Sequence, residues 1–324
     1  MDIYVKKAII HQFSPDDTDL YLADKFLNIT PKIEEYLRKK IERVYSDEAR
    51  TGIFEEDNPF LEMISDDLLE TSVAVANRWK EEFVISENQK TNDLVFIQFS
   101  KEGVDHFACL RIALRETLTH LGGEVDNPIK LTQNNLPGFG TGADEALVIN
   151  LQSRKYHLIE KRIKYNGTFL NYFSENLLQA QPKISPKKSI KALEKTAQKI
   201  AESFNTDDFQ FQSKVKSAIF NHIEEENKLS PEKLADDLFD DNLTARLSFI
   251  DQVKEAVPEP VTFEEIDASR QLKKFENQKL SLSNGIELIV PNNVYEDAES
   301  VEFILNEKGT YSILIKSIED IQSK

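Results

Sequence analysis

The side chains with the clearest spacing for chemistry in this sequence are lysines that follow Pro186. They recur every three or four residues, and so do the apolar residues from Ile190 to Phe204. At about 100° per residue on a helix, the lysines fall on the face opposite the apolar stripe. Ammonium groups along one helix face suit contacts with phosphates of a nucleic-acid backbone. A solvated helix face without a ligand is the simpler interpretation. The set is Lys187, Lys188, Lys191, Lys195 and Lys199.

A second group of cations lies between residues 154 and 164, where five basic residues stand against one acidic residue. Local positive charge of this kind attracts phosphate, and it equally describes an ordinary solvated surface. The sequence therefore offers a second candidate for the same chemistry. Its members are Arg154, Lys155, Lys161, Arg162 and Lys164.

The net charge of −17 restricts how either group can act. A strongly acidic protein repels nucleic acid on average, so any such binding has to use local basic patches. The charge is segregated along the chain: residues 183–216 hold eight lysines against four acids, and residues 217–324 hold 11 basic against 23 acidic residues. The acidic second half also suits a basic partner protein.

Catalytic patterns are missing from the sequence. A hydrolase needs a nucleophile with a base, or carboxylates with a metal or an acid partner. We find no G-x-S-x-G, H-E-x-x-H or Walker Gly-Lys-Ser/Thr pattern. Acidic clusters at 55–57, 66–67 and 144–145 offer oxygen ligands for Mg²⁺, but clusters of this kind arise by chance among 57 acidic residues. We therefore predict no catalytic residue, no metal site and no cofactor.

Cysteine and histidine offer no alternative chemistry. The single cysteine, Cys109, falls on a predicted strand whose alternation places it on the face opposite His106. One cysteine forms no intrachain disulfide, which is typical of a reducing cytoplasm. No apolar run approaches the roughly 20 residues needed to cross a bilayer, and no signal peptide is evident, so we expect no membrane association.

The glycine-rich stretch 138–142 is predicted to be a flexible loop. Its glycines lack the G-x-G-x-x-G spacing, and no Lys-Ser/Thr pair follows them. Binding of phosphate by this loop is the less favoured alternative.

The elements that must position these residues begin with a central hairpin. The apolar run within Asp93–Ser100 predicts a strand buried on both faces, which turns at 101–103 into a second strand, Val104–Arg115. Arg111 and Arg115 share a face, and we expect them to pair with acidic residues rather than with phosphate. Further strands are expected at Ile3–Phe13, Leu20–Ile29 and Ala146–Leu151, with Lys155–Ile163 as a hairpin partner or the start of a helix.

Helices are expected around this sheet. Thr30-Pro31 starts one whose basic side chains, Lys40 and Arg43 among them, are expected to face solvent. Asn58-Pro59 starts a long helix towards Val84, in which Trp79 is expected to be a core residue. A third helix is expected at Thr168–Leu178.

The second half starts with the lysine helix, capped by Ser185. Further helices follow, including one started by Ser230-Pro231 and one begun by a capping box of Thr262 with Glu265. Turns at Asn284-Gly285 and Lys308-Gly309 then predict two hairpins that form a small antiparallel meander. We predict an α+β protein with a first domain at 1–182, built on a mostly antiparallel sheet flanked by helices, and a second domain at 183–324.

Several of these stretches combine into a pattern that spans nearly the whole chain, and in this pattern the chain resembles the bacterial nucleoid-associated protein family known as NdpA or YejK. The resemblance implies a cytoplasmic protein of the nucleoid that binds DNA or DNA-handling machinery and is not an enzyme. The matching stretches are Lys7–Gln12, Arg43–Ser46, Gly52–Phe54, His106–Leu114, Arg162–Leu178 and Leu280–Ile315.

Two functional hypotheses follow. In the first, a non-enzymatic nucleoid-associated protein binds double-stranded DNA sequence-independently through its local basic surfaces. In the second, an acidic adaptor binds DNA-handling enzymes such as topoisomerases or other nucleoid proteins, and its contact with DNA is indirect. A Mg²⁺-dependent nuclease is a third and less favoured reading. Whether the protein forms a homodimer stays open.

Overall fold

The computed structural model describes residues 1–322 except 15–18, 85–90, 121–128, 207–208 and 264. The chain divides into two compact units, Met1–Ser185 and Pro186–Lys324. Each unit is described by itself below. The domain boundary that the sequence suggests, between residues 182 and 183, stays a prediction.

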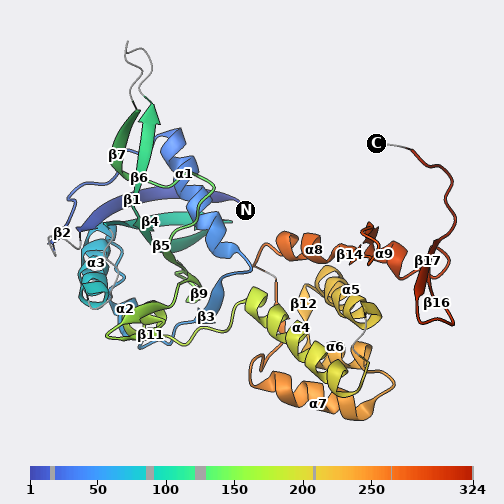
Figure 1. The fold of residues 1–324 in the computed structure, drawn as a ribbon. Coiled ribbons are helices and arrows are strands. Elements are labelled where there is room, and N and C mark those ends of the chain that lie inside the picture. Colours follow the sequence, from blue (N-terminus) through green and yellow to red (C-terminus); the bar gives the residue numbers. More distant parts are fainter. Residues whose placement is uncertain (15–18, 85–90, 121–128, 207–208, 264, 323–324) are drawn as a thin grey trace. The chain divides into compact units, whose positions relative to one another are not determined.

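The first unit is built on a seven-stranded, fully antiparallel sheet with the strand order β2-β1-β4-β5-β8-β9-β3 (Figure 1). The predicted hairpin, now β4 and β5, lies at its centre and joins Lys101 to Val104 through Gly103 at φ +82°. The strands are β1 Ile3–Ser14, β2 Asp19–Tyr21, β3 Arg50–Ile53, β4 Asn92–Lys101, β5 Val104–Ala113, β8 Glu145–Asn150 and β9 Lys155–Ile159.

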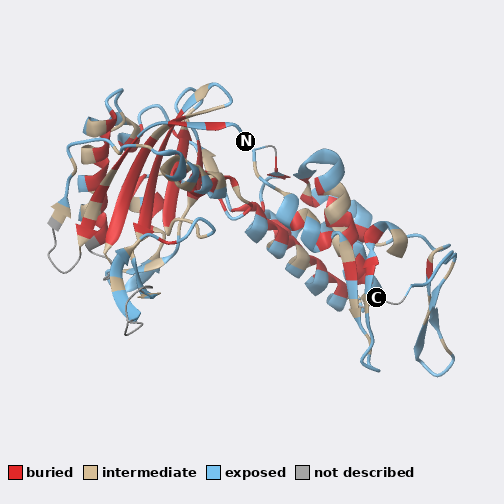
Figure 2. Cartoon of the chain, turned by 90° about the horizontal axis from the view of Figure 1, so that it is seen from above, coloured by how far each residue is buried: buried red, intermediate tan, exposed pale blue. Residues whose placement is uncertain are grey.

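Helices cover both faces of this sheet, which explains why its central strands read as continuous apolar runs. Figure 2 shows these strands buried beneath the helices. Helix α1 (Pro31–Glu42) packs on the face that carries Val95, Ala108 and Leu110. Helices α2 (Pro59–Glu62) and α3 (Leu68–Val84) and the π-helix η2 (Phe173–Leu177) cover the opposite face. The sheet with flanking helices confirms the predicted α+β class.

Some helix starts follow the sequence signals and others do not. Thr30 caps α1 as expected, accepting a hydrogen bond from the Ile33 amide. The helix expected from Asn58 to Val84 is broken in two, because the Asp67 carboxylate caps a new start by accepting from the Leu69 amide. Trp79 is a core residue with 1% of its surface exposed, as expected.

Two predicted elements of the first unit are shorter than expected. Only Leu20 and Tyr21 of the predicted strand Leu20–Ile29 lie in a strand, because the next residues turn back so that the Ala23 amide donates to the His11 ring. The expected helix Thr168–Leu178 starts instead as strand β11 (Thr168–Leu170). This strand pairs with β10 (Ile163–Tyr165) around Gly167 at φ +82°, and only η2 is helical.

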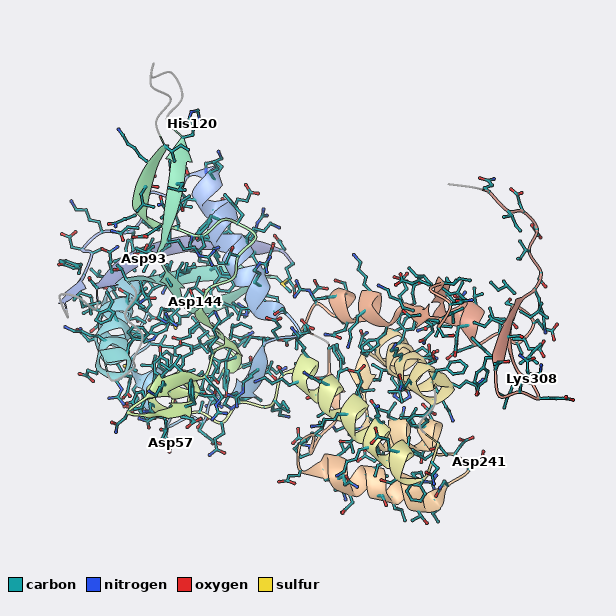
Figure 3. The ribbon with its side chains drawn as sticks, in the orientation of Figure 1. Asp57, Asp93, His120, Asp144, Asp241 and Lys308 are labelled. Atoms are coloured by element: carbon teal, nitrogen blue, oxygen red, sulfur yellow. The ribbon has the colours of Figure 1, made fainter. Side chains whose placement is uncertain are left out.

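A two-stranded arm, β6 (Arg115–His120) with β7 (Ile129–Asn135), projects from the sheet, and Figure 3 places His120 at its outer end. The sequence did not predict this arm. Strand β5 ends at Ala113, two residues before the predicted end. A register shift between Arg115 and Thr117 marks the base of the arm.

The second unit is a cluster of helices around one apolar core that includes Ile190, Leu193 and Ile219. The helices are α4 Pro186–Ser203, α5 Phe209–Glu226, α6 Pro231–Leu238, α7 Leu243–Lys254, α8 Ser269–Phe275 and α9 Asn292–Tyr295. Ser230 caps α6 and accepts from the Lys233 amide, which agrees with the Ser-Pro start signal.

The C-terminal meander is present as two separate hairpins, β14 (Asn277–Ser281) with β15 (Glu287–Pro291) and β16 (Val301–Leu305) with β17 (Tyr311–Ile315). The capping box proposed for Thr262 and Glu265 is wrong. Thr262 belongs to β13 (Val261–Thr262), which pairs with β12 (Lys228–Leu229), because Val261 and Phe263 are drawn into the helical core. Helix α8 begins only at Ser269.

One buried ion pair joins the central strands of the first unit to its helices. Arg111 on β5 donates from Nε to Glu145 Oε2 on β8 at 2.7 Å, and the two side chains are 3% and 0% exposed. The Arg111 guanidinium also donates to Asn92 and lies over the Phe83 ring. Tyr172 donates to Glu145 and accepts from Trp79 Nε1. The expectation that Arg111 pairs with an acid is therefore confirmed, whereas the same expectation for Arg115 is wrong, since it forms no ion pair among the described residues.

We predict that Arg111→Met lowers the free energy of unfolding by roughly 3–5 kcal/mol, because Glu145 would keep a buried charge without its partner. Urea unfolding measures this loss. The matched control is Lys233→Met, which removes one end of an exposed pair with Glu226 and should cost about 1 kcal/mol or less. Equal losses in the two variants would contradict a special role for the buried pair.

Candidate functional site

The lysines of α4 lie on its solvent face. Lys187, Lys188, Lys191, Lys195 and Lys199 are all exposed, whereas Ile190, Leu193, Ala197 and Ile200 are buried. The apolar residues hold their own face of α4 against the helical core, so the face that carries the lysines points outwards. The structure thus places the first predicted cation set along a single exposed helix face.

The exposed set forms a narrow band along the helix. At 100° per residue, Lys188, Lys191, Lys195 and Lys199 span an arc of about 80°, and the rise of 1.5 Å per residue extends them over about 16 Å. Two acidic residues limit the band. Glu194 lies beside it and pairs with Lys274 Nζ at 3.4 Å, while Glu202 follows it at the C-terminal end of α4.

The charge of this band is largely unneutralised. Among the residues that the structure describes, Lys188, Lys191 and Lys195 form no ion pair. Lys199 Nζ donates to the Gln252 amide oxygen at 3.0 Å, which fixes its position without cancelling its charge. The N-terminus of α4 adds the positive end of the helix dipole near Lys187 and Lys188. These side chains can therefore offer ammonium groups to an anionic ligand.

The second cation set is divided by strand β9. Arg154 and Lys155 lie at the start of the strand, and the other three follow its end, about 13 Å further on at 3.3 Å per residue. Arg154 pairs with Glu56 at 2.9 Å, and Lys161 pairs with Asp144 at 3.1 Å. Arg162 donates to the Phe169 carbonyl at 2.6 Å. The structure therefore does not gather this set into one patch. Its role in binding stays a prediction.

The acidic clusters are engaged in local contacts. Glu56 pairs with Arg154, Asp67 caps α3, and Asp144 accepts from the Ala113 amide and Lys161. Figure 3 shows Asp57, Asp93 and Asp144 in separate parts of the first unit. Within the described residues, no group of three or more His, Cys, Asp or Glu side chains is arranged to hold a metal ion.

The cysteine and histidine of β5 do not form a reactive pair. Cys109 packs in the cluster under α3, and burial raises the pKa of its thiol well above the usual value. His106 faces the other way, where its Nδ1 lies 2.9 Å from the Val104 carbonyl oxygen. The thiol is therefore protonated and out of contact with a base.

Sequence reasoning missed a cation that the fold buries. Lys40 was expected on a solvated helix face, but it is fully buried. Its Nζ donates to the carbonyl oxygens of Gly138 at 2.9 Å and Thr141 at 2.5 Å. Tyr36 also donates to the Pro137 carbonyl at 3.0 Å. The glycine loop is thus fastened to α1, in contrast to the flexible loop expected. Nothing in the helical spacing marks Lys40, because its partners lie about 100 residues away in the sequence.

Comparison with protein families yields a match over nearly the whole chain. The family model described as nucleoid-associated protein YejK matches residues 9–321. A search of curated proteins found no match. Among the described helices, none is long and apolar enough to cross a membrane.

Lys40 makes stability depend on pH in a predictable direction. Burial, together with the charges of Arg43 and Arg115, lowers the pKa of Lys40 from 10.5 to about 8. Between these two values the unfolded chain holds more protons, so the free energy of unfolding should rise with pH in this window. Urea unfolding of wild type and Lys40→Met from pH 7.5 to 10.5 tests this, with exposed Lys32→Met as the control for losing one charge. Parallel pH profiles for wild type and Lys40→Met would refute the assignment.

Proposed function

The chain belongs to the family of the nucleoid-associated protein YejK, and from that premise we propose that it binds duplex DNA directly, without sequence preference, through the lysine face of α4. Nucleoid association comes with the family. The proposal adds the direct contact, its lack of sequence preference and the residues that make it. No catalytic step is part of it.

The observation that carries the proposal is the row of unpaired, exposed lysines on a protein that is otherwise acidic. Several cations of the second unit are paired in the described structure, among them Lys214 with Asp240, Lys233 with Glu226 and Arg246 with Asp236. Lys188, Lys191 and Lys195 form no ion pair in the described structure. A cation whose charge is not cancelled within the protein releases a DNA counterion when it meets a phosphate, and this release favours binding.

The chemistry of the surface argues for binding without sequence preference. Lysine ammonium groups contact phosphates as point charges, and phosphate contacts carry no direct information about the bases. Base readout would require side chains such as Arg, Asn or Gln to enter a groove. Between Lys187 and Lys199 the exposed residues of α4 are five lysines and Gln198, so side chains that contact phosphates predominate.

We predict that the triple variant Lys188→Gln, Lys191→Gln and Lys195→Gln binds duplex DNA more weakly and with a shallower salt dependence. If each lysine contacts one phosphate, the slope of log K against log salt should fall in magnitude by about 2.7. Fluorescence anisotropy with a labelled duplex of arbitrary sequence, titrated from about 50 to 200 mM salt, measures this slope.

The matched control is Lys214→Gln, Lys233→Gln and Arg246→Gln, which removes the same total charge from the same unit. Because these side chains are already paired, their loss should change the slope little. If both triple variants lose the same slope, net charge governs binding and the α4 surface is not the contact. A wild type that binds no DNA would overturn the proposal altogether.

The alternative function, an adaptor for basic partners, is favoured by an acidic cleft in the second unit. Five carboxylates line it, from α5, from α6 and from the residue that follows α9, against the cations of Lys214 and Lys233. His222 also lines the cleft, and its Nε2 lies 2.7 Å from Asp237 Oδ2. Such a surface suits a Lys- or Arg-rich segment of a DNA-handling enzyme such as a topoisomerase. The five carboxylates are Glu225, Glu226, Asp236, Asp237 and Glu296.

We predict that, if the protein is an adaptor, partners captured from lysate remain bound after nuclease treatment and are lost on Glu225→Gln with Asp236→Asn. The acid-to-amide changes keep shape and remove the charge that would attract a basic segment. The triple lysine variant is the control and should retain those partners. Release of every partner by nuclease would count against the adaptor.

A further inference from the structure

The glycine loop of the first unit is held in one shape at the base of the arm. Lys40 donates to two of its carbonyl groups, and Tyr36 donates to a third, that of Pro137. The Tyr36 ring also meets the Phe139 ring edge-on, with centroids 5.4 Å apart. A loop fixed at four points presents a defined surface rather than a changing one.

Two arginines flank this loop. Arg43 lies in the single turn that follows α1, and its side chain packs beside Gly142. A Cβ atom added to Gly142 would lie 3.7 Å from Arg43 Cδ. Arg115 is the first residue of β6 and pairs across the arm with Asn135, two residues before Pro137. The register shift beside Arg115 is the kind of irregularity that redirects a side chain. Both arginines are exposed.

The positive charge around the loop has little compensation. Arg43 and Arg115 form no ion pair within the part of the chain that the structure describes, and the buried Lys40 meets carbonyl oxygens and the Tyr36 ring. Both arginines help to lower the pKa of Lys40 after burial itself, which is the expected result of three cations near one another. Two nearby acids are already engaged: Asp93 is buried and accepts from Gln12, and Asp144 accepts from the Ala113 amide and Lys161.

We propose that Arg43 and Arg115 form a second phosphate contact for duplex DNA, on the first unit, with the fixed loop 137–142 between them. The inference rests on the proposed DNA binding but uses different residues from α4. Guanidinium groups bind phosphate oxygens in a bidentate manner and remain charged at any physiological pH. Two such groups beside one rigid loop provide an anchor for the sugar-phosphate backbone.

The shape of the surface favours a polymer backbone over a free anion. A Cβ on Gly138 or Gly140 would meet no atom within 4 Å, so the loop surface is open. Two clefts of the described structure lie elsewhere, one between α5 and α6 and one beside Tyr165. An open loop between two cations can lie against a continuous strand, whereas a small anion would need an enclosing pocket.

The test uses the full-length double variant Arg43→Gln with Arg115→Gln in the same anisotropy titration. If each arginine contacts one phosphate, the salt slope should fall in magnitude by about 1.8. Lys25→Gln with Lys308→Gln removes two exposed, unpaired charges outside both surfaces and should leave the slope unchanged. Urea unfolding of each variant confirms that the fold is retained.

A second variant, at a different residue, keeps the proposal testable if the double arginine variant does not fold. Gly140→Asp adds a carboxylate to the loop where there is space for a side chain, so it should weaken DNA binding without a loss of stability. Unchanged slopes in the arginine variant and unchanged affinity in Gly140→Asp would overturn this contact. If the α4 triple variant still loses slope, the proposed function survives that result. A wild type that binds no DNA refutes both proposals.

A competition experiment tests whether the two arginines bind the phosphates of a DNA backbone or a small phosphate anion. Inorganic phosphate that replaces chloride at equal ionic strength and millimolar concentration should not displace the duplex from wild type, if the anchor takes a polymer backbone. Displacement in wild type that is lost in the double arginine variant would identify a site for a small anion. That result would overturn the assignment to DNA.

Discussion

The first unit depends on one buried charge pair that is shared between strands and helices. Arg111 and Glu145 are neighbours across β5 and β8, so the pair fixes the register at the middle of the sheet. Tyr172 and Trp79 extend the network to η2 and α3. A charge buried without its partner is costly, so strand order and helix placement must form together for the pair to be satisfied. This shared requirement fixes the ends of β5 and β8, between which the arm and the loop are connected.

Whether each cation has an acidic partner in the fold also distinguishes the two basic stretches of the sequence, residues 154–164 and 183–216. Both have four more cations than acids by simple count. In the folded protein, Arg154 and Lys161 meet Glu56 and Asp144, whose sequence positions are distant. Lys188, Lys191 and Lys195 on α4 meet none in the described structure. A count along the chain therefore identifies where positive charge is concentrated, and the tertiary contacts decide how much of it remains available.

Much of the fold could be predicted from the sequence because the signals were local. The alternation of β4 and β5, the caps at Thr30 and Ser230 and the Asn284-Gly285 turn each depend on a few consecutive residues. The exposed face of α4 also follows from spacing alone. The predictions failed where a distant partner overrode the local pattern. Lys40 is buried by carbonyl groups about 100 residues away, and Thr262 is held in a strand by Lys228.

An acidic protein can use small basic surfaces because charge acts over a short range in salt. At physiological ionic strength the screening length is about 8 Å, so carboxylates much further than this from a phosphate contribute little repulsion. Contacts at the α4 lysines are affected mainly by their own surroundings, in which Glu194 is already paired with Lys274. The same screening weakens the repulsion that the net charge of −17 would exert on DNA at a distance. The proposed contact at α4 therefore depends on the unpaired lysines Lys188, Lys191 and Lys195 rather than on the total charge of the chain.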